Sequence, residues 1–336
     1  VNDATTAAAG PAAVQSAPAE AVHRAELAFL AAHDAGPRPP GWRLTPRAVV
    51  TFVMGSDGPL RLPKGAAAPD GAGPSLAISA KFIGDASLVE RAVVTLAGER
   101  GLLLVGEPGT AKSMLSELLA AAVSGSSALT VQGTAGTTEE QLRYGWNYAM
   151  LLASGPSVDA LVASPVLTAM REGQVARIEE ITRCVPEVQD ALVSILSERR
   201  LAVPELGGEA IEFARPGFNV IATANLRDRG VSEMSAALKR RCHLGRVAPI
   251  ADLGAEIALV RSQATAAVAR ADQPFALDDA VLEAVVTAFR DLRSGRTVEG
   301  WEVERPASVM STAEAVGVAT FLALEATYFP SSKDPL

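Results

Sequence analysis

The chain has 336 residues, and its 49% hydrophobic content is enough for one substantial core and a smaller second one. Its 30 Lys and Arg against 38 Asp and Glu give a net charge of −8, which argues against duplex nucleic acid as the main ligand. The 2 cysteines lie outside any metal-binding spacing, and neither a secretory signal nor a membrane-spanning apolar run is visible, so the sequence predicts a cytoplasmic protein.

Residues 1–74 are predicted to form an N-terminal arm, partly disordered, that ends in a linker. Residues 1–18 are rich in Ala and Pro and show no hydrophobic period, as in disordered segments. A short helix is expected over residues 20–35, and a small element over 45–54 has Pro46 where a helix would start. Residues 64–74 have almost no large apolar side chain, which is typical of a linker or long loop.

Residues 75–250 alternate between strand and helix patterns. Short apolar runs typical of buried parallel strands lie at 101–105, 128–131, 175–178 and 218–222, with helical stretches between them. This alternation predicts an α/β fold in which a parallel sheet is flanked by helices. Only helical patterns remain in residues 251–336, so a second, all-helical subdomain is expected there.

A phosphate-binding loop follows the first buried strand. Its motif comprises Gly106, Glu107, Pro108, Gly109, Thr110, Ala111, Lys112 and Ser113. Met114, the next residue, is also expected to contact the nucleotide. Backbone N–H groups of such a loop surround the β-phosphate, Lys112 reaches the β and γ oxygens, and the Ser113 hydroxyl ligates Mg²⁺. Ala111 stands where glycine would be expected, and its methyl group is tolerable if φ is negative. The loop therefore predicts ATP and Mg²⁺ as cofactors.

Two carboxylates, Glu179 and Glu180, end the buried strand that begins at Val175. Ligand chemistry in open α/β sheets takes place at this end of the strands, so Glu179 would hold hydrated Mg²⁺ and Glu180 would be the general base. Asp is usual in the first role, and the extra methylene of Glu179 would make its contact with the metal shifted or water-mediated. Alternatively, the pair is solvated at a helix start, where carboxylates favour the dipole.

Polar residues farther along the chain complete the predicted site. Asn225 follows the strand at 218–222, where it could orient the attacking water. A degenerate guanine-reading motif at 225–228 is the alternative, but it lacks the lysine. Arg240 and Arg241 end a helical stretch and are candidates for an arginine finger that reaches the γ-phosphate bound by a neighbouring subunit. They could also simply complement the helix dipole.

From about Phe82 to the C-terminus, these features resemble the AAA+ ATPases and, within them, the MoxR-like branch. The loop matches the GxPGxAK[ST] pattern of that branch, and residues 218–225 match its FxVIATxN segment. Arg241 aligns best with the finger of the family, and Arg240 is the next candidate. One departure is Met310, which stands where the lid normally carries a sensor 2 arginine. Arg305 is the nearest substitute.

The resemblance implies a P-loop NTPase αβα core with a small C-terminal helical lid. It also implies a homo-oligomeric ring, expected to be a hexamer, that hydrolyses ATP to remodel or help assemble a partner protein, often one with a von Willebrand factor A domain. A slow assembly scaffold of the gas-vesicle type and a nucleic-acid motor are the alternatives, the second disfavoured by the acidic charge. The aromatic residues Tyr144, Trp146 and Tyr148 could grip a client in the ring pore, pack as an insert, or stack on single-stranded nucleic acid.

Overall fold

The computed structural model of the chain describes residues 17–69, 71–208, 210–225, 233–270, 277–306 and 310–329. Residues 1–16, for which disorder is expected, lie outside the described residues. Within those ranges, no helix combines the length and the apolar character needed to cross a lipid bilayer.

A parallel sheet of five strands forms the centre of the fold, in the order β11-β3-β10-β7-β4. The strands are β3 (Gly101–Gly106), β4 (Thr130–Gln132), β7 (Val175–Glu179), β10 (Asn219–Asn225) and β11 (Cys242–Arg246). The four predicted strands are therefore confirmed, whereas β11 was not predicted. Parallel pairing places the C-terminal ends of the strands at one edge, with Asn225 in register with Gly106 and Gln132 with Glu179.

Helices cover both faces of the sheet, as predicted for an αβα core. Alternate side chains of β3 enter different cores: Leu102 and Leu104 face a cluster with α4 (Ala86–Ala97) and α5 (Lys112–Ser124). Leu103 and Val105 face a second cluster with α8 (Pro165–Glu172) and α9 (Pro186–Glu198). This alternation is the result of the two-residue period of a strand that is buried on both sides.

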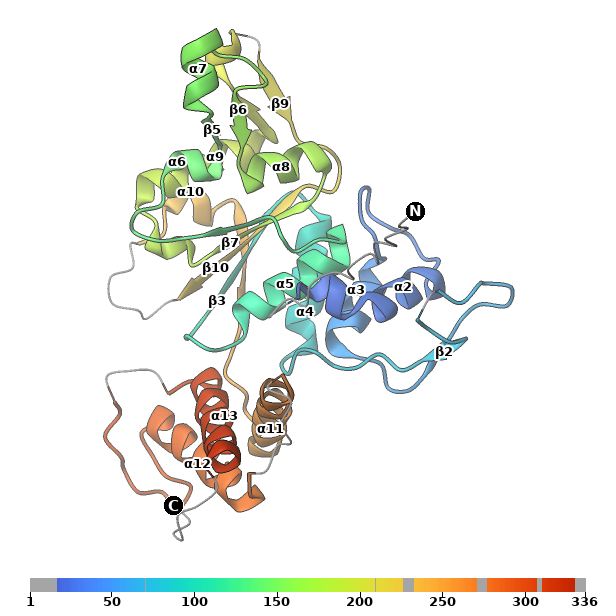
Figure 1. Cartoon of the computed structure of the whole chain (residues 1–336), viewed down its shortest axis with the longest axis vertical. Coiled ribbons are helices and arrows are strands. Elements are labelled where there is room, and N and C mark those ends of the chain that lie inside the picture. The colour runs from blue at the N-terminus through green and yellow to red at the C-terminus, as the bar shows by residue number, and fades with distance from the viewer. Residues whose placement is uncertain are drawn as a thin grey trace, which may run out of the picture.

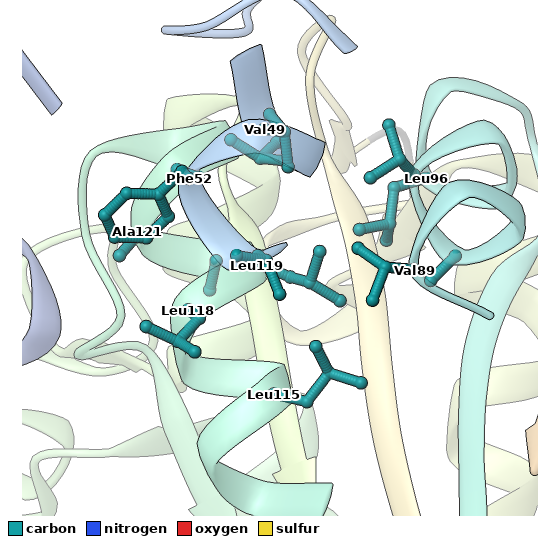
Figure 2. Close-up of a cluster of buried hydrophobic side chains, with 14 of the residues drawn as sticks. Val49, Phe52, Val89, Leu96, Leu115, Leu118, Leu119 and Ala121 are labelled. Carbon is teal, nitrogen blue, oxygen red and sulfur yellow. The ribbon is translucent and has the colours of Figure 1, made fainter. Parts of the chain in front are cut away.

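The N-terminal helices belong to the first of these cores. They are α1 (Ala19–Val22), α2 (Arg24–His33) and α3 (Pro46–Met54), which agree with the helical segments expected at 20–35 and 45–54. Val49 and Phe52 of α3 belong to the same buried cluster as Leu118 and Leu119 of α5 (Figure 2). The short strands β1 (Leu60–Arg61) and β2 (Ser75–Leu76) pair antiparallel, so the loop expected over 64–74 closes a hairpin. The domain boundary at residue 74 stays a prediction.

An extension at one end of the core is built from two antiparallel hairpins (Figure 1). One hairpin, which we call the apical insert, comprises residues 144–163, with β5 (Tyr144–Trp146), α7 (Tyr148–Ser154) and β6 (Leu161–Ala163). The other pairs β8 (Arg200–Ala202) with β9 (Ile211–Phe213). The connecting elements are α6 (Glu139–Leu142), α10 (Ala236–Lys239) and the 3₁₀ turns Ile181–Arg183 and Pro204–Leu206.

The C-terminal helices form a separate small subdomain, the lid, at the opposite end from the apical insert (Figure 1). These helices are α11 (Leu253–Ala269), α12 (Asp279–Ser294) and α13 (Thr312–Tyr328). They enclose their own apolar core, made of Val260, Ala264, Leu282, Val286, Ala315 and Ala319. The predicted helical subdomain is thus confirmed.

Candidate nucleotide-binding site

A cavity of about 430 Å³ lies between the sheet edge and the lid. The phosphate-binding loop lines it from Pro108 to Met114, as do Glu180 and Asn225. The lid contributes Gln263 and Thr312 among others. Gly106, at the end of β3, and Glu107, at the start of the loop, do not belong to this lining. The cavity therefore collects most of the residues that the sequence predicts for nucleotide binding.

The backbone of the loop is unusual at Ala111. Its φ of 61° and ψ of 24° place it in the left-handed region, so the condition stated for tolerating the methyl group, a negative φ, is not met. A residue with a Cβ atom costs about 1–2 kcal/mol in this conformation, so the loop holds Ala111 under strain immediately before α5 begins. Gly109 also has a positive φ, 73°, and a Cβ atom there would lie 2.2 Å from the Cβ of Ser311 in the lid.

Lys112 points back into the loop that carries it. Its side chain is buried, and Nζ donates hydrogen bonds to the carbonyl oxygens of Glu107 at 2.6 Å and Gly106 at 3.3 Å. A small movement of the ammonium group would replace its hydrogen bonds to the carbonyl oxygens by hydrogen bonds to phosphate oxygens. This position therefore suits the role predicted for Lys112.

Glu179 is buried, and each of its carboxylate oxygens accepts two hydrogen bonds. Oε2 accepts from Ser113 Oγ at 2.7 Å and from Thr223 Oγ1 at 2.8 Å. Oε1 accepts from Ser116 Oγ at 2.6 Å and from the Arg177 guanidinium at 2.8 Å. Burial pushes the pKa of the Glu179 carboxyl up, but the hydroxyl donors and the guanidinium outweigh burial, so this pKa lies below its ordinary value.

Glu180 follows at the strand end with φ 55°, a second residue in the left-handed region. Its backbone N–H donates to Thr223 Oγ1 at 2.9 Å, which fixes the turn. The sharp turn directs its carboxylate, which also pairs with Arg183, to a different side from that of Glu179. The two adjacent carboxylates are therefore separated into a buried group and a partly exposed one that lines the cavity.

The structure does not bring Arg240 and Arg241 to this cavity. Arg241 donates to the carbonyl oxygen of Ala237 at 2.9 Å and to the hydroxyl of Ser197, so it is folded against its own subunit. Arg240 is exposed, and within the described ranges its side chain makes no hydrogen bond or ion pair. Arg305 also lies outside the cavity, where it donates to the Ser294 carbonyl at 2.5 Å.

The lid side of the cavity is held by a buried carboxylate, Glu256 of α11. Glu256 accepts hydrogen bonds from Arg290 at 2.8 Å, from Arg293 at 3.0 Å and from the Thr312 hydroxyl at 2.6 Å. Arg290 also donates to the carbonyl oxygen of Ile250 at 3.2 Å, in the segment that joins core and lid. This network joins the three lid helices and fixes Thr312 at the cavity wall.

The aromatic residues near 144–148 are split by the fold. Tyr144 is buried, and its hydroxyl donates to Glu205 at 2.8 Å, while its ring meets Trp146 edge to face at 6.0 Å. Tyr148 is 63% exposed at the start of α7, and Leu152 on the same helix is 88% exposed. The first two residues are thus packed, whereas Tyr148 belongs to an apolar surface on the apical insert.

Three residues of the site were not predicted from the sequence as parts of it: Ser116, Arg177 and Thr223. The available signal for Arg177 was a charged residue inside the short apolar run at 175–178, two positions before Glu179 and therefore on the same face of the strand. Thr223 was noted only as part of the strand motif. Ser116 has no signal in the sequence, since a serine within a helix is common.

Comparisons with known proteins agree with this fold and site. Residues 101–242 match the family model for the AAA domain of the dynein-related subfamily, and residues 254–336 match that for the C-terminal domain of YehL-like AAA+ ATPases. The uncharacterized protein YehL of Escherichia coli strain K12 is 48% identical over 316 residues, which cover 94% of this chain and 82% of that protein. Protein SH1500 of Staphylococcus haemolyticus is 30% identical over 67% of this chain and 80% of its own length.

A solved structure of NtrX from Brucella abortus in complex with ATP aligns with a TM-score of 0.50 at 12% identity. The alignment covers 77% of this chain and 55% of that one, so it shows similarity of fold alone. The resemblance expected from the loop, the acidic strand and the sensor segment is confirmed by the two family models and by the long match to YehL. The chain therefore belongs to the AAA+ ATPases, in the YehL-like family.

Proposed function

We propose that this chain binds ATP with Mg²⁺ in the cavity and hydrolyses it. The observation that carries the proposal is the 2.7 Å hydrogen bond between Ser113 Oγ and Glu179 Oε2, next to the loop that holds Lys112. These oxygens are the two predicted metal ligands, and Mg²⁺ in nucleotide sites takes only one or two protein ligands beside water and phosphate. Ser113 and Glu179 would hold Mg²⁺, which would supply positive charge to neutralise the negative charge that develops on the phosphate oxygens. The residues present fit this group.

Residues of the chain would bind the phosphates, accept a proton from the attacking water and orient that water. The loop N–H groups and the N-terminus of α5 bind phosphate oxygens, and Lys112 moves its hydrogen bonds from the loop carbonyls to the β and γ oxygens. Glu180 accepts the proton of the attacking water, for which its carboxylate leaves Arg183. Asn225, at the end of the neighbouring strand, orients that water. The presence of ATP in the NtrX structure, which has a similar fold, is consistent with this nucleotide.

Lys112→Ala tests the binding step. Because no other ammonium lies within the loop, this variant should lose measurable affinity for ATP in equilibrium binding with a fluorescent analogue. Lys64→Ala, which removes an exposed lysine from the loop between β1 and β2, is the matched control and should bind like the wild type. Wild-type affinity in Lys112→Ala would show that nucleotide is bound elsewhere.

We further propose that the active form is a homo-oligomeric ring, a hexamer, in which an arginine finger completes the neighbouring site. Family alignment favours Arg241, but the exposed side chain of Arg240 makes no hydrogen bond or ion pair with the described residues, so we propose Arg240 for this role. Inactive Glu180→Gln and inactive Arg240→Ala subunits, when co-assembled, should regain part of the activity, since some interfaces then combine an intact Glu180 with an intact Arg240. Mixed rings that stay inactive would contradict a finger donated in trans.

The partner in this proposal is a protein, engaged through the apical insert. Tyr148, Leu152, Val158 and Val162 expose between 52% and 88% of their surface there, which favours an apolar contact with protein over a nucleic-acid surface. Following the family resemblance, we propose a partner with a von Willebrand factor A domain. Glu180→Gln rings should retain such a protein, and Leu152→Asp should release it without loss of ATP binding. Stimulation of the ATPase by DNA would favour the motor alternative, and very slow turnover with stable assembly would favour the scaffold.

A further inference from the structure

Arg177 is a charged residue in the middle of β7, and only 8% of its surface is exposed. All three nitrogens of its guanidinium donate hydrogen bonds. Nε donates to Ser116 Oγ at 3.0 Å, and Nη1 donates to the carbonyl oxygen of Ser127 at 3.1 Å. Nη2 donates to the carbonyl oxygen of Ser113 at 3.1 Å and to Glu179 Oε1 at 2.8 Å. A buried guanidinium satisfied in this way has one fixed orientation.

The contacts of Glu179 divide its carboxylate into two sides. Oε1 is held by Arg177 and Ser116, behind the site. Oε2 faces Ser113, the other predicted ligand of Mg²⁺. A glutamate has one more side-chain torsion than an aspartate, so an unsupported glutamate at this position would sample several orientations of the carboxylate. The guanidinium removes that freedom by fixing one oxygen, which leaves the other in place for the metal.

We propose that Arg177 is a positioning residue that enables a glutamate to serve at the metal site in place of aspartate. It fixes Oε1 of Glu179 and, through the same nitrogen, the backbone carbonyl of Ser113, so that one guanidinium sets the relative position of both predicted Mg²⁺ ligands. This inference rests on the proposed function. A lysine could not take over this role, because its single nitrogen cannot span the acceptors that the planar guanidinium reaches.

The competing explanation is that Arg177 only neutralises a buried carboxylate. In that case removal of the guanidinium would leave Glu179 with uncompensated negative charge, which would attract Mg²⁺ more strongly. Positioning predicts the opposite, because partners behind a metal ligand typically contribute a factor of about 10–100 in metal affinity through orientation. The sign of the change in Mg²⁺ dependence therefore separates the two explanations.

The test measures how much Mg²⁺ improves the affinity of the full-length protein for fluorescent ADP, as the ratio of Kd in EDTA to Kd in Mg²⁺. Arg177→Met should lower this ratio by about 10-fold or more while Kd in EDTA changes little. Arg177→Lys, which keeps the charge, should lower it as well. Arg199→Met is the matched control, because Arg199 is a partly buried arginine whose guanidinium also donates to backbone carbonyl oxygens, those of Glu99 and Phe218, away from the site.

Rescue provides the second part of the test. Glu179→Asp in the Arg177→Met background should restore most of the Mg²⁺ dependence. The aspartate side chain has one torsion fewer, so its carboxylate needs no guanidinium to hold its orientation. An unchanged or increased ratio in Arg177→Met, or an unimproved double variant, would overturn the inference. Failure of the proposed function would appear differently, as the absence of any Mg²⁺ effect in the wild-type protein.

Discussion

Replacement of Glu256 by Gln should loosen the lid, because this carboxylate is fully buried and joins all three lid helices. Glutamine keeps one acceptor oxygen but turns a donor toward Arg290 or Arg293, where the wild type has a charge-assisted hydrogen bond. Breaking a buried ion pair by removal of one partner costs roughly 3–5 kcal/mol. Since the side chains of Arg290 and Arg293 are 26% and 14% exposed and can regain some water, we expect the low end, about 3 kcal/mol.

Hydrogen–deuterium exchange resolved by peptide is the suitable assay, because it separates opening of the lid from unfolding of the core. A loss of about 3 kcal/mol corresponds to roughly 100-fold faster exchange in α11 and α13, while α5 should be unaffected. Glu283→Gln is the matched control, since Glu283 is an exposed glutamate on α12. Wild-type protection of the lid in Glu256→Gln, or equal loss of protection in α5, would refute the role given to this network.

Three further outcomes follow from the geometry. Arg240→Ala should bind ATP but release phosphate about 10³-fold more slowly than the wild type. Arg241→Ala should mainly lower the midpoint temperature of thermal unfolding. The reverse pattern would identify Arg241 as the arginine finger. Ala111→Gly should raise the free energy of unfolding, measured by urea denaturation, by about 0.5 kcal/mol. The reason is that relief of the left-handed strain in the folded loop exceeds the entropy that glycine adds to the unfolded chain. A lower urea midpoint would contradict this. Tyr144→Phe should lower the free energy of unfolding by about 1 kcal/mol, because the hydrogen bond from the Tyr144 hydroxyl to Glu205 is lost. Because burial, and then Glu205, raise the pKa of Tyr144 to about 12, the phenol stays protonated and this loss should be equal at pH 7 and pH 10.

Sequence patterns predicted the parts of the site that depend on short spacings. The loop before Lys112 follows a buried strand, and the carboxylates Glu179 and Glu180 lie at the end of another. In a parallel sheet the ends of such strands meet at one edge, and so the sequence also placed Asn225 close to them. The helices at 20–35 and 45–54 were equally visible, because they depend on local periodicity and on Pro46 at a helix start.

The rest depends on contacts between distant segments. The left-handed φ of Ala111 follows from how the loop joins β3 to α5, and no property of alanine indicates it. The strand β11 has no β-branched residue, and its position is set by pairing with β3 along its full length. The roles of Arg177 and Ser116 exist only because β7 and α5 pack together and place both beside Glu179. For Arg177 the sequence offers only its position two residues before Glu179, and for Ser116 it offers no spacing at all, because Ser116 lies 63 residues away from Glu179 in the chain.

The central claim is that Glu180, at the cavity, activates water for hydrolysis of ATP bound by the loop. The most direct test compares Glu180→Gln with the wild type in two measurements on one preparation, equilibrium binding of ATP and steady-state release of phosphate, with Glu187→Gln on α9 as the exposed control. We predict unchanged ATP affinity and loss of turnover by at least ~10²-fold, because an amide cannot accept the proton of water. Turnover equal to that of the wild type and of Glu187→Gln would contradict the account.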